Sequence, residues 1–573
     1  MKILGIHDGH GASVCLLEDG VIKYVIQEER LTNVKNKSGF PFKSIERILE
    51  ISGLTINDID YVAMASKHMV TRPDNRDELF KLYKKSASYR GKVDQFLMQT
   101  PIYSVYKKFK RKERLENLKK IGIKENKVIF IDHHLCHASA AYFGSPWWKD
   151  EPVLVLTCDG AGDGVCSRVY VGESGKLNKI AETPRGNSIG HIYEWVTFMM
   201  GFVPGEHEYK IMGLAPYASK DGTDKTYKIF DKYLKLDREG LTFKRGIREP
   251  THLMYSRLRR ELEFLRFDWI AGGLQKKTEE ILVEWVRSCI KKTGIYKVAL
   301  GGGVFMNVKA NKRIMKRPEV ESLFVFPSCG DESLSIGAAF CLYSQKCLES
   351  GEIPNIPPLK DIYFGDSFSD AEVEAVIKEH RNIFQFEYEY VDDIEKRIAE
   401  LLAEGKIVAR CKGRMEYGAR ALGNRSILAD SSDPKCVKTI NAMIKNRDFW
   451  MPFAPVILKE RERDYIINPK NIPAPYMIMA FDTTDKREDF IAAIHQADLT
   501  ARPQIIEKEW NPEFYKILKE FEKLTGRGVL LNTSFNLHGY PIVHGPREAM
   551  WTFKNSGLEY LALGNYLLHK RAL

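Results

Sequence analysis

The stretch "PVLVLTCDGAGDG", residues 152–164, joins an apolar strand to an Asp-Gly pair and a loop of small residues. The N-terminus repeats this arrangement in "ILGIHDGHGA", residues 3–12. In both places two further strands are expected to follow, separated by a tight turn that contains glycine. The two Asp-Gly pairs lie about 150 residues apart, which is too far for a short solenoid repeat. The pattern therefore predicts two similar α/β halves within one domain.

Duplicated halves that face each other across a cleft are the plan of the actin and hexokinase fold. In that plan, the loops after the first strands approach the phosphates of a nucleotide. Two unrelated meanders are the alternative. The sequence thus predicts an α/β protein whose N-terminal domain, residues 1–350, is duplicated and actin-like, with a cleft lined by strand ends.

Length and composition favour a globular protein of two domains. The chain has 573 residues, of which 44% are apolar and 28% are charged. We expect no transmembrane helix, because no stretch approaches about 18 apolar residues. The first residues, "MKILGIHDGH", are expected to form a strand and not a signal peptide. The ten cysteines are scattered singly, which argues against disulfides and structural zinc and favours the cytoplasm.

The net charge of +11 is concentrated in one segment. Residues 107–120, "KKFKRKERLENLKK", hold eight basic and two acidic residues. They belong to a longer basic segment, residues 71–120, that carries no recognised motif. A solvated helix face is the simpler interpretation. A basic patch that attracts an anionic partner or contributes to acceptor recognition is the alternative.

Three histidines fall within five residues in "IDHHLCHASAA". His133 and His137 are four residues apart, so a helix would place both imidazoles on one face, where they could bind one metal ion. His134 would point elsewhere. Asp159 and Asp331 each follow an apolar strand and could complete the ligand set. Two imidazoles with two carboxylates suit iron, manganese or zinc, and a polar helix end without metal is the alternative.

A glycine triplet marks a candidate nucleotide site. In "VALGGGVFMN" the glycines Gly301, Gly302 and Gly303 follow a strand and precede an expected helix, where backbone N–H groups can approach phosphate or ribose. We assign Asn307, in the same motif, to this site. Lys210, in "EHEYKIMGLA", is a candidate phosphate contact, and a surface lysine is the alternative. His10, after the first strand, is a candidate base that deprotonates an acceptor or positions it.

The linker "LESGEIPNIPPLKD" separates a second domain, residues 361–573. Five basic residues, Arg410, Lys412, Arg414, Arg420 and Arg425, fall close together there, and further basic side chains follow. Such a cluster among small residues suits a substrate that carries phosphate and carbonyl groups. Surface salt bridges are the alternative. The candidate binding residues are Arg414, Arg420, Lys445, Arg447, Arg502, Asn532 and Ser534.

Seven motifs occur along the chain in this order: "HHLCHASAA", "GEHEYKIMGLAPY", "GGGVFMN", "GDESLSIGAA", "GRMEYGARALGNRSILAD", "TARPQ" and "LNTSFNLHGYPIV". Together they resemble the motifs of the O-carbamoyltransferase family, which includes nodulation-factor, cephem-antibiotic and aminoglycoside carbamoyltransferases. The resemblance covers nearly the whole chain, and its long block "GRMEYGARALGNRS" is highly specific.

The resemblance implies an actin-like (Kae-like) domain similar to the tRNA-threonylcarbamoylating protein, and a YrdC-like α/β domain similar to threonylcarbamoyl-adenylate synthase. It implies that carbamoyl phosphate and ATP, with Mg²⁺, form a carbamoyl-adenylate in the second domain. The first domain would then transfer the carbamoyl group to a hydroxyl of a small metabolite or sugar. The family's metal ligands fall on His133, His137, Asp159 and Asp331, with iron favoured. Arg502 and Ser534 match its carbamoyl phosphate-binding positions.

Two other functions stay open at this point. Modification of tRNA or nucleosides is one, although the basic segment lacks the interleaved aromatic residues of a stacking platform, so a nucleic-acid partner is not expected. An ATP-gated binding protein of the actin-like class is the other, and it leaves the second domain's cationic cluster unexplained. No membrane partner is expected, and a homodimer is an open alternative.

Overall fold

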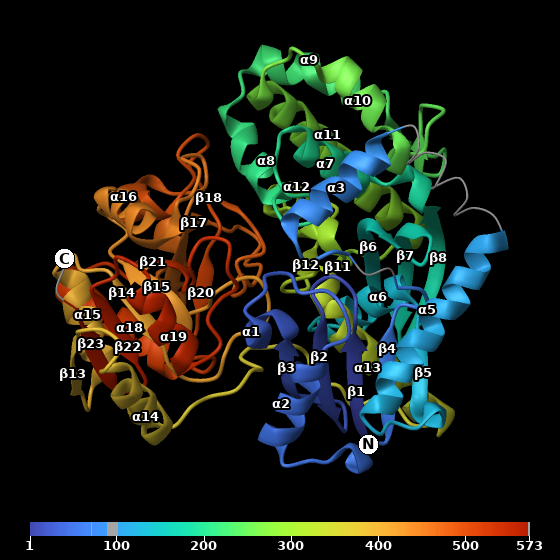
Figure 1. Cartoon of the computed structure of the whole chain (residues 1–573). Coiled ribbons are helices and arrows are strands. Elements are labelled where there is room, and N and C mark those ends of the chain that lie inside the picture. The colour runs from blue at the N-terminus through green and yellow to red at the C-terminus, as the bar shows by residue number, and fades with distance from the viewer. Residues whose placement is uncertain (70–71, 89–100, 571–573) are drawn as a thin grey trace. The chain divides into compact units, whose positions relative to one another are not determined.

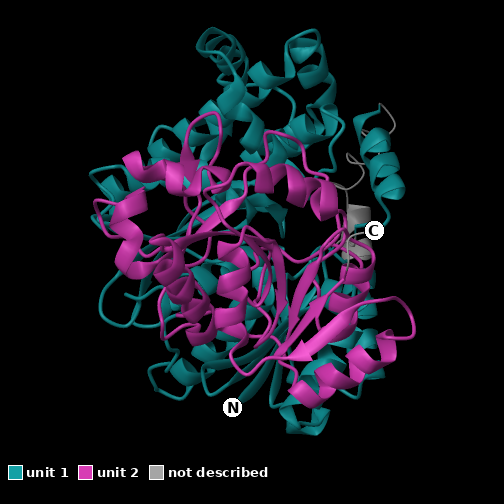
Figure 2. Cartoon of the chain, turned by 90° about the vertical axis from the view of Figure 1, so that its left-hand side faces the viewer, with its two compact units in different colours: residues 1–32, 36–359 teal, residues 33–35, 360–573 magenta. Residues whose placement is uncertain are grey.

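The structure is a computed structural model that describes residues 1–69, 72–88 and 101–570 (Figure 1). The chain divides into two compact units (Figure 2). Unit 1 comprises Met1–Thr32 and Asn36–Leu359, and unit 2 comprises Asn33–Lys35 and Lys360–Leu573. The basic segment 71–120 lies partly outside the described residues, at residue 71 and at residues 89–100.

The first half of unit 1 is a five-stranded sheet of order β3-β2-β1-β4-β5. The first three strands form an antiparallel meander, and β4 and β5 continue the sheet in parallel with β1. The strands are β1 (Lys2–His7), β2 (Ser13–Glu18), β3 (Val21–Gln27), β4 (Tyr61–Ala65) and β5 (Val128–Ile131).

The second half of unit 1 repeats this topology. Its sheet has the order β8-β7-β6-β11-β12, with β6, β7 and β8 antiparallel and β11 and β12 parallel to β6. The strands are β6 (Val153–Gly162), β7 (Val165–Glu173), β8 (Lys176–Pro184), β11 (Lys297–Gly301) and β12 (Ser322–Val325). The same strand order in both halves confirms the predicted duplicated, actin-like α/β fold.

Two helices connect the halves. α6 (His133–Gly144) follows the first sheet but packs on β6 and β11 of the second, whereas α13 (Leu334–Glu349) follows the second sheet and packs on β1, β2 and β4 of the first. α6 and α13 also pack against each other. Glycine permits this close approach. A Cβ at Gly5 would lie 1.9 Å from the carbonyl oxygen of Ser335, and a Cβ at Gly337 would lie 1.9 Å from that of Cys136. β6 and the 3₁₀ turn Asp331–Ser333, which follows β12, therefore both lie against α6.

The remaining elements of unit 1 surround this core. α2 packs on β2 and β3, α7 packs on β6, and the long α11 packs against α8, α9 and α12. They are α1 (Glu28–Thr32), α2 (Phe42–Ser52), α3 (Arg76–Ala87), α5 (Pro101–Lys120), α7 (Ile189–Met199), α8 (Glu208–Leu214), α9 (Lys220–Phe230), β9 (Leu234–Leu236), β10 (Phe243–Arg245), α10 (Tyr255–Leu262), α11 (Phe267–Thr293) and α12 (Val308–Met315).

Unit 2 is a second α/β structure, built on an eight-stranded mixed sheet of order β13-β23-β22-β14-β15-β21-β16-β20. The strands are β13 (Glu387–Tyr390), β14 (Val408–Cys411), β15 (Arg425–Ala429), β16 (Ala454–Leu458), β20 (Gln504–Ile506), β21 (Val529–Ser534), β22 (Tyr560–Leu563) and β23 (Tyr566–His569). A small sheet contains β17 (Ile466–Ile467), β18 (Phe481–Thr483) and β19 (Thr500–Ala501).

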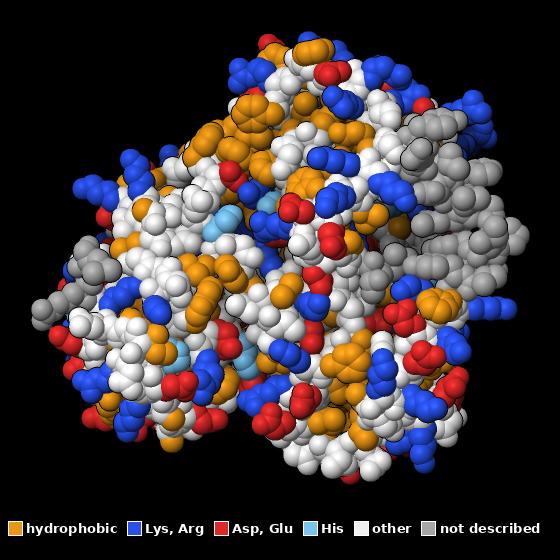
Figure 3. All heavy atoms as spheres, in the orientation of Figure 1, with side chains coloured by type: hydrophobic (Ala, Val, Ile, Leu, Met, Phe, Trp, Pro, Cys, Tyr) orange, Lys and Arg blue, Asp and Glu red, His pale blue; other side chains and the backbone are white. Residues whose placement is uncertain are grey.

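Helices cover both faces of this large sheet. α14 (Asp370–His380) and α19 (Pro546–Lys554) bury Ile377 and Phe553 against one face. α15 (Ile394–Ala403) and α18 (Pro512–Thr525) bury Leu402 and Phe521 against the other. The short helices are α16 (Lys435–Ile440) and α17 (Glu462–Tyr465). On the face shown in Figure 3, basic and acidic side chains are interspersed in both units.

Candidate metal centre and cationic site

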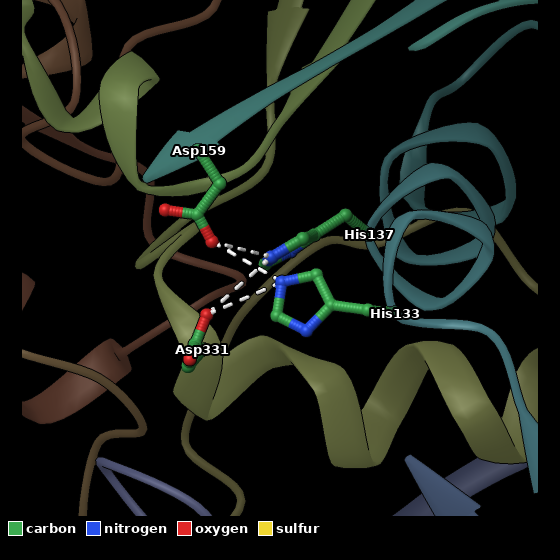
Figure 4. A group of neighbouring side chains, drawn as sticks. All are labelled: His133, His137, Asp159 and Asp331. Carbon is green, nitrogen blue, oxygen red and sulfur yellow. Dashed lines mark hydrogen bonds and ion pairs between the residues drawn. The ribbon is translucent and has the colours of Figure 1, made fainter. Parts of the chain in front are cut away.

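Four side chains from three segments of unit 1 converge where the strands end. His133 and His137 lie one turn apart at the start of α6, with ring centroids 4.8 Å apart. The side chain of Asp132 caps this helix by accepting a hydrogen bond from the N–H of Leu135. Asp159 lies at an irregularity near the end of β6, and Asp331 follows β12. Figure 4 shows that the four side chains point toward one another.

The geometry suits a single metal ion. One ligand atom from each of His133, His137, Asp159 and Asp331 lies within 4.8 Å of the other three. Nε2 of His133 is 3.2 Å from Oδ2 of Asp159, and Nε2 of His137 is 3.4 Å from the same oxygen. Both Nε2 atoms lie 3.6 Å from Oδ1 of Asp331. These four residues, which the sequence predicted together, form a candidate metal site.

Two serines fix the orientation of the imidazoles. The Ser333 hydroxyl donates to the carbonyl of Gly330 at 2.8 Å, so it accepts from Nδ1–H of His137 at 3.2 Å. Nε2 of His137 therefore faces the carboxylates, where it holds a proton in the metal-free cluster and would offer its lone pair to a metal. Nδ1 of His133 contacts the Ser66 hydroxyl at 2.9 Å, so its Nε2 also faces the centre. Such outer contacts are typical of histidines that bind metal.

The metal-free cluster binds protons tightly. Burial lowers the pKa of His137, but hydrogen bonds and charge from Asp159 and Asp331 outweigh it and raise that pKa to about 9. The pKa of His133 is raised by the same two carboxylates against the effect of burial. Burial opposes ionisation of Asp159, yet the two histidines hold its pKa well below the usual range. A dication in this place would substitute for those protons.

His134 is separate from the centre, as the spacing predicts. Its Nδ1 contacts the Thr157 hydroxyl at 2.9 Å and its Nε2 contacts the carbonyl of Val165 at 3.0 Å. Burial lowers its pKa to about 3, so it is neutral. Gly162 packs closely on His133, since a Cβ at Gly162 would lie 2.0 Å from Cγ of His133. Sequence analysis did not identify Ser66, Ser333 or Gly162, since a lone serine or glycine carries no signature.

His10 lies beside the first strand end, where its Nε2 contacts the carbonyl of Gly205 at 3.1 Å. Burial, and next the charge of Arg72, lower the pKa of His10, so the imidazole is neutral. Nearby, Arg114 of α5 donates to Asp8 at 2.7 Å and to the carbonyls of Ser66 and Ala65. The basic segment is therefore anchored at the strand ends by a buried arginine.

The predicted nucleotide residues have local partners in the structure. A Cβ at Gly301 would lie 2.7 Å from the His137 carbonyl oxygen, and one at Gly302 would lie 2.3 Å from that of Cys158. Gly302 has a φ of 97°, which favours glycine. A Cβ at Gly303 would lie 3.0 Å from Oδ1 of Asp159. The three glycines thus allow close packing at the end of β11, and larger residues at these positions would disturb the fold.

The other two nucleotide candidates lie on helices around α11. Asn307 caps α12 by accepting from the N–H of Ala310, and its amide exchanges hydrogen bonds with Gln275. Lys210 lies on α8, with its ammonium 5.0 Å from the ring centroid of Phe202. Their contact with a nucleotide stays a prediction.

Unit 2 brings three of the predicted arginines together. Burial, and next the charges of Arg420 and Arg447, lower the pKa of Arg502 well below its usual value. Arg502 is half-buried and makes no hydrogen bond or ion pair with residues in the described ranges. Arg447 donates to the Thr533 hydroxyl at 3.0 Å and lies over the ring of Phe453. Clustered guanidinium groups without a carboxylate partner for Arg502 favour an anionic ligand.

Lys445 borders the same strand end. Its ammonium donates to the Ser534 carbonyl, to the Ser534 hydroxyl at 3.2 Å and to Oδ1 of Asn536 at 2.7 Å. Burial lowers its pKa well below the usual value. Asn532 donates to the Ala421 carbonyl and to Gln504, whereas its Oδ1 is buried without a hydrogen-bond partner in the part of the chain that is described.

Other basic residues of the predicted cluster bind the protein itself. Arg410 is fully buried, donates to Gly423 and pairs with Glu513 at 3.0 Å. Arg425 is also buried and donates to backbone carbonyls, including that of His544 at 2.8 Å. Lys412 pairs with Glu395 and Glu513. Most of their donors are used within the protein, and their part in substrate binding stays a prediction.

Arg414 donates to the carbonyls of Gly365 and Phe364, and its role in binding stays a prediction.

Within the described ranges, no helix combines the length and apolar character needed to cross a bilayer.

Comparison with known proteins identifies the family. Residues 2–340 match the carbamoyltransferase N-terminus and residues 399–570 match the carbamoyltransferase C-terminus. Nodulation protein NolNO of Sinorhizobium fredii is 30% identical, covering 99% of this chain and 79% of its own length. An uncharacterised protein of Methanocaldococcus jannaschii is 34% identical, covering 82% and 78%.

Among solved structures, component A of (R)-2-hydroxyglutaryl-CoA dehydratase from Acidaminococcus fermentans aligns with 61% of this chain and 99% of its own, at 15% identity and a TM-score of 0.34. The two family matches together cover most of the sequence. The chain therefore belongs to the carbamoyltransferase family and is a carbamoyltransferase enzyme.

Proposed function

We propose that the enzyme is an ATP-dependent O-carbamoyltransferase. Carbamoyl phosphate is the donor, a carbamoyl-adenylate is the intermediate, and a hydroxyl of a small metabolite or sugar is the acceptor. Unit 2 forms the adenylate and unit 1 performs the transfer. The observation that carries this proposal is Arg502, a half-buried arginine that lies near two further guanidinium groups and has no carboxylate partner among the described residues.

The arrangement in unit 2 suits the activation step. Carbamate is a poor acylating agent, and joining it to AMP supplies a phosphate leaving group. The three guanidinium groups offer donors for phosphate and carbonyl oxygens, and Asn532, on β21, has a buried Oδ1 without a hydrogen-bond partner in the described part of the chain. The site would also have to exclude water, which hydrolyses the mixed anhydride.

Unit 1 suits the transfer step. His133, His137, Asp159 and Asp331 would hold a divalent metal. The buried Nε2 of His137, which has no hydrogen-bond partner among the described residues, supports this assignment. A bound metal would supply Lewis acidity and could orient a carbonyl or phosphate oxygen. His10 is neutral and positioned by the Gly205 carbonyl, so its other nitrogen could accept the proton of an acceptor hydroxyl.

Mass spectrometry tests this function. The full chain, loaded with Fe²⁺, would be incubated with ATP, Mg²⁺, isotope-labelled carbamoyl phosphate and a panel of sugars, nucleosides and aminoglycosides. The proposal predicts labelled carbamoyl transfer that requires both ATP and carbamoyl phosphate, with release of pyrophosphate. Release of pyrophosphate that does not depend on carbamoyl phosphate, or carbamoylation without ATP, would contradict it.

A further inference from the structure

A cluster of basic and imidazole groups lies beside the candidate metal centre, at the start of α7. It is formed by Arg185, His191, Arg245 and His252, and this group of residues is called the α7 pocket below. Arg245 is exposed and donates to Oδ1 of Asn187 at 3.1 Å. The 3₁₀ turns Arg185–Asn187 and Thr251–Leu253 pack against each other. β10 contacts the first turn and α7 contacts the second. No residue of this cluster belongs to the predicted metal, nucleotide or carbamoyl phosphate sites.

The α7 pocket is attached directly to a candidate metal ligand. The Ser188 hydroxyl donates to the backbone carbonyl of Asp159 at 3.1 Å. At Gly190 a Cβ would lie 3.0 Å from the backbone nitrogen of Gly160, so α7 begins in close contact with the end of β6. Ser188 also donates from its N–H to the Thr251 hydroxyl at 3.0 Å, which fixes the two turns together.

The strongest sign of a ligand is an unpartnered imidazole. His252 is only 8% exposed, and its Nδ1 has no hydrogen-bond partner in the described part of the chain. The ring of His191 lies 5.7 Å away, centroid to centroid, and its Nδ1 is also buried without a partner there. Buried polar atoms are rarely left unpaired, so a bound group is expected to complete these contacts.

The charge around the two imidazoles is positive. Burial lowers the pKa of His252 to about 3, and the charges of Arg185, His191 and Arg245 act in the same direction. The acidic side chain on this part of α7, Glu194, is already paired with Arg72 at 2.6 Å and with the Tyr83 hydroxyl at 2.8 Å. The N-terminus of α7 adds a partial positive charge. These groups together match an anion.

We propose that the α7 pocket binds an anionic oxygen group, a phosphate or carboxylate, carried by the hydroxylated acceptor. This proposal rests on the proposed function, because it places the acceptor hydroxyl at the metal centre and the acceptor's anionic group beside Asp159. The acceptor class is then a phosphorylated or carboxylated metabolite, and neutral or cationic acceptors are disfavoured.

Calorimetric binding of glucose 6-phosphate tests the proposal without catalysis. The full chain would carry Arg502→Ala, so that the cationic cluster of unit 2 does not contribute to phosphate binding. Within this background, Arg245→Ala and His252→Gln should weaken binding by about tenfold or more, because each removes a contact to a charged group. His252→Asn keeps a polar atom near the position of Nδ1 and should retain part of the affinity. Lys244→Ala removes an exposed charge from the same strand and should change affinity less than about twofold.

Unchanged affinity in folded Arg245→Ala and His252→Gln proteins would overturn the proposal. A comparison with AMP distinguishes the source of the anion. If AMP binds in a manner that depends on His252 and glucose 6-phosphate does not compete, the pocket serves the nucleotide and the acceptor assignment is wrong. Glucose should bind at least about tenfold more weakly than its phosphate. These outcomes do not depend on adenylate formation, so they are separate from failure of the proposed function.

Discussion

Nε2 of His137 lies 3.4 Å from Oδ2 of Asp159, yet it has no hydrogen-bond partner among the residues that the structure describes. Its other ring nitrogen is engaged by Ser333. A buried imidazole nitrogen that faces two carboxylates requires a proton or a cation. The convergence of two histidines on α6 with two strand-end aspartates therefore gives direct tests of metal binding.

Replacement of His137 should remove the metal. His137→Ala deletes a ligand from a four-residue site, and elemental analysis of the purified protein should show metal content reduced to a small fraction of wild type. His134→Gln is the matched control, because His134 lies in the same turn but binds Thr157 and Val165. Full metal occupancy in His137→Ala would refute the assignment.

A methyl group at Gly162 should displace a metal ligand. A Cβ there would lie 2.0 Å from Cγ of His133, so Gly162→Ala should lower metal affinity by at least about tenfold and cost about 1–3 kcal/mol in unfolding free energy. At Gly160, in the same strand, a Cβ would meet nothing within 4 Å, so Gly160→Ala is the control. Metal titration and urea unfolding measure both effects. Equal metal affinity in the two variants would contradict the geometry.

The Ser333 hydroxyl should tune the metal site from outside it. Ser333→Ala leaves Nδ1–H of His137 without its acceptor, and loss of such outer contacts commonly reduces metal affinity by about 10–100-fold. Ser335→Ala removes a buried hydroxyl of the same segment that binds Ser13 and not a histidine. Competition with a chelator should show weaker metal binding only in Ser333→Ala. The same loss in both variants would indicate a general structural effect.

Stability should depend on pH through Glu208. Burial, and next the charge of Glu194, raise its pKa from 4.5 to about 7. Between these two pKa values the folded state keeps a proton on Glu208 that the unfolded chain has lost. The contribution of Glu208 to the free energy of unfolding is therefore fully present below pH 4.5 and is lost as the pH rises through 7. Glu208→Gln can still accept from the N–H of Gly205 and should stabilise the protein at pH 8 by on the order of 1–3 kcal/mol.

Urea unfolding at pH 4.5 and pH 8 measures this effect. The difference between Glu208→Gln and wild type should be large at pH 8 and small at pH 4.5. A difference that is equal at both values would show that Glu208 does not titrate in this range.

Much of unit 1 could be predicted from the sequence because its signals are local. The Asp-Gly pairs after apolar strands indicated the duplicated sheets, and the spacing of His133 and His137 placed both on one helical face. The contacts of Ser66, Ser333 and Gly162 with these histidines could not be predicted, since they join segments far apart in the chain. Only the packing of α6 between β6 and α13 brings them together.

In the cationic cluster of unit 2, the sequence could not separate residues that bind a ligand from residues that bind the protein itself. In the sequence, Arg410 and Arg425 have surroundings and spacing similar to those of Arg420. In the structure, however, both are buried, where Arg410 pairs with Glu513 and Arg425 donates to backbone carbonyls. Arginine serves structure and binding through the same donors, and the sequence does not show which partners the fold supplies. Arg502 differs from both because it has no hydrogen-bond or ion-pair partner among the described residues.

The most direct test of the two-site account is a pair of variants assayed for both half-reactions. Arg502→Ala should lose carbamoyl phosphate-dependent release of pyrophosphate from ATP, because removing a charged contact to the donor costs on the order of 2–5 kcal/mol. It should still transfer the carbamoyl group from supplied carbamoyl-adenylate. His137→Ala should release pyrophosphate but leave the acceptor unmodified. If folded Arg502→Ala also fails with supplied adenylate, or if His137→Ala still modifies the acceptor at the wild-type rate, the division of activation and transfer between the two units is wrong.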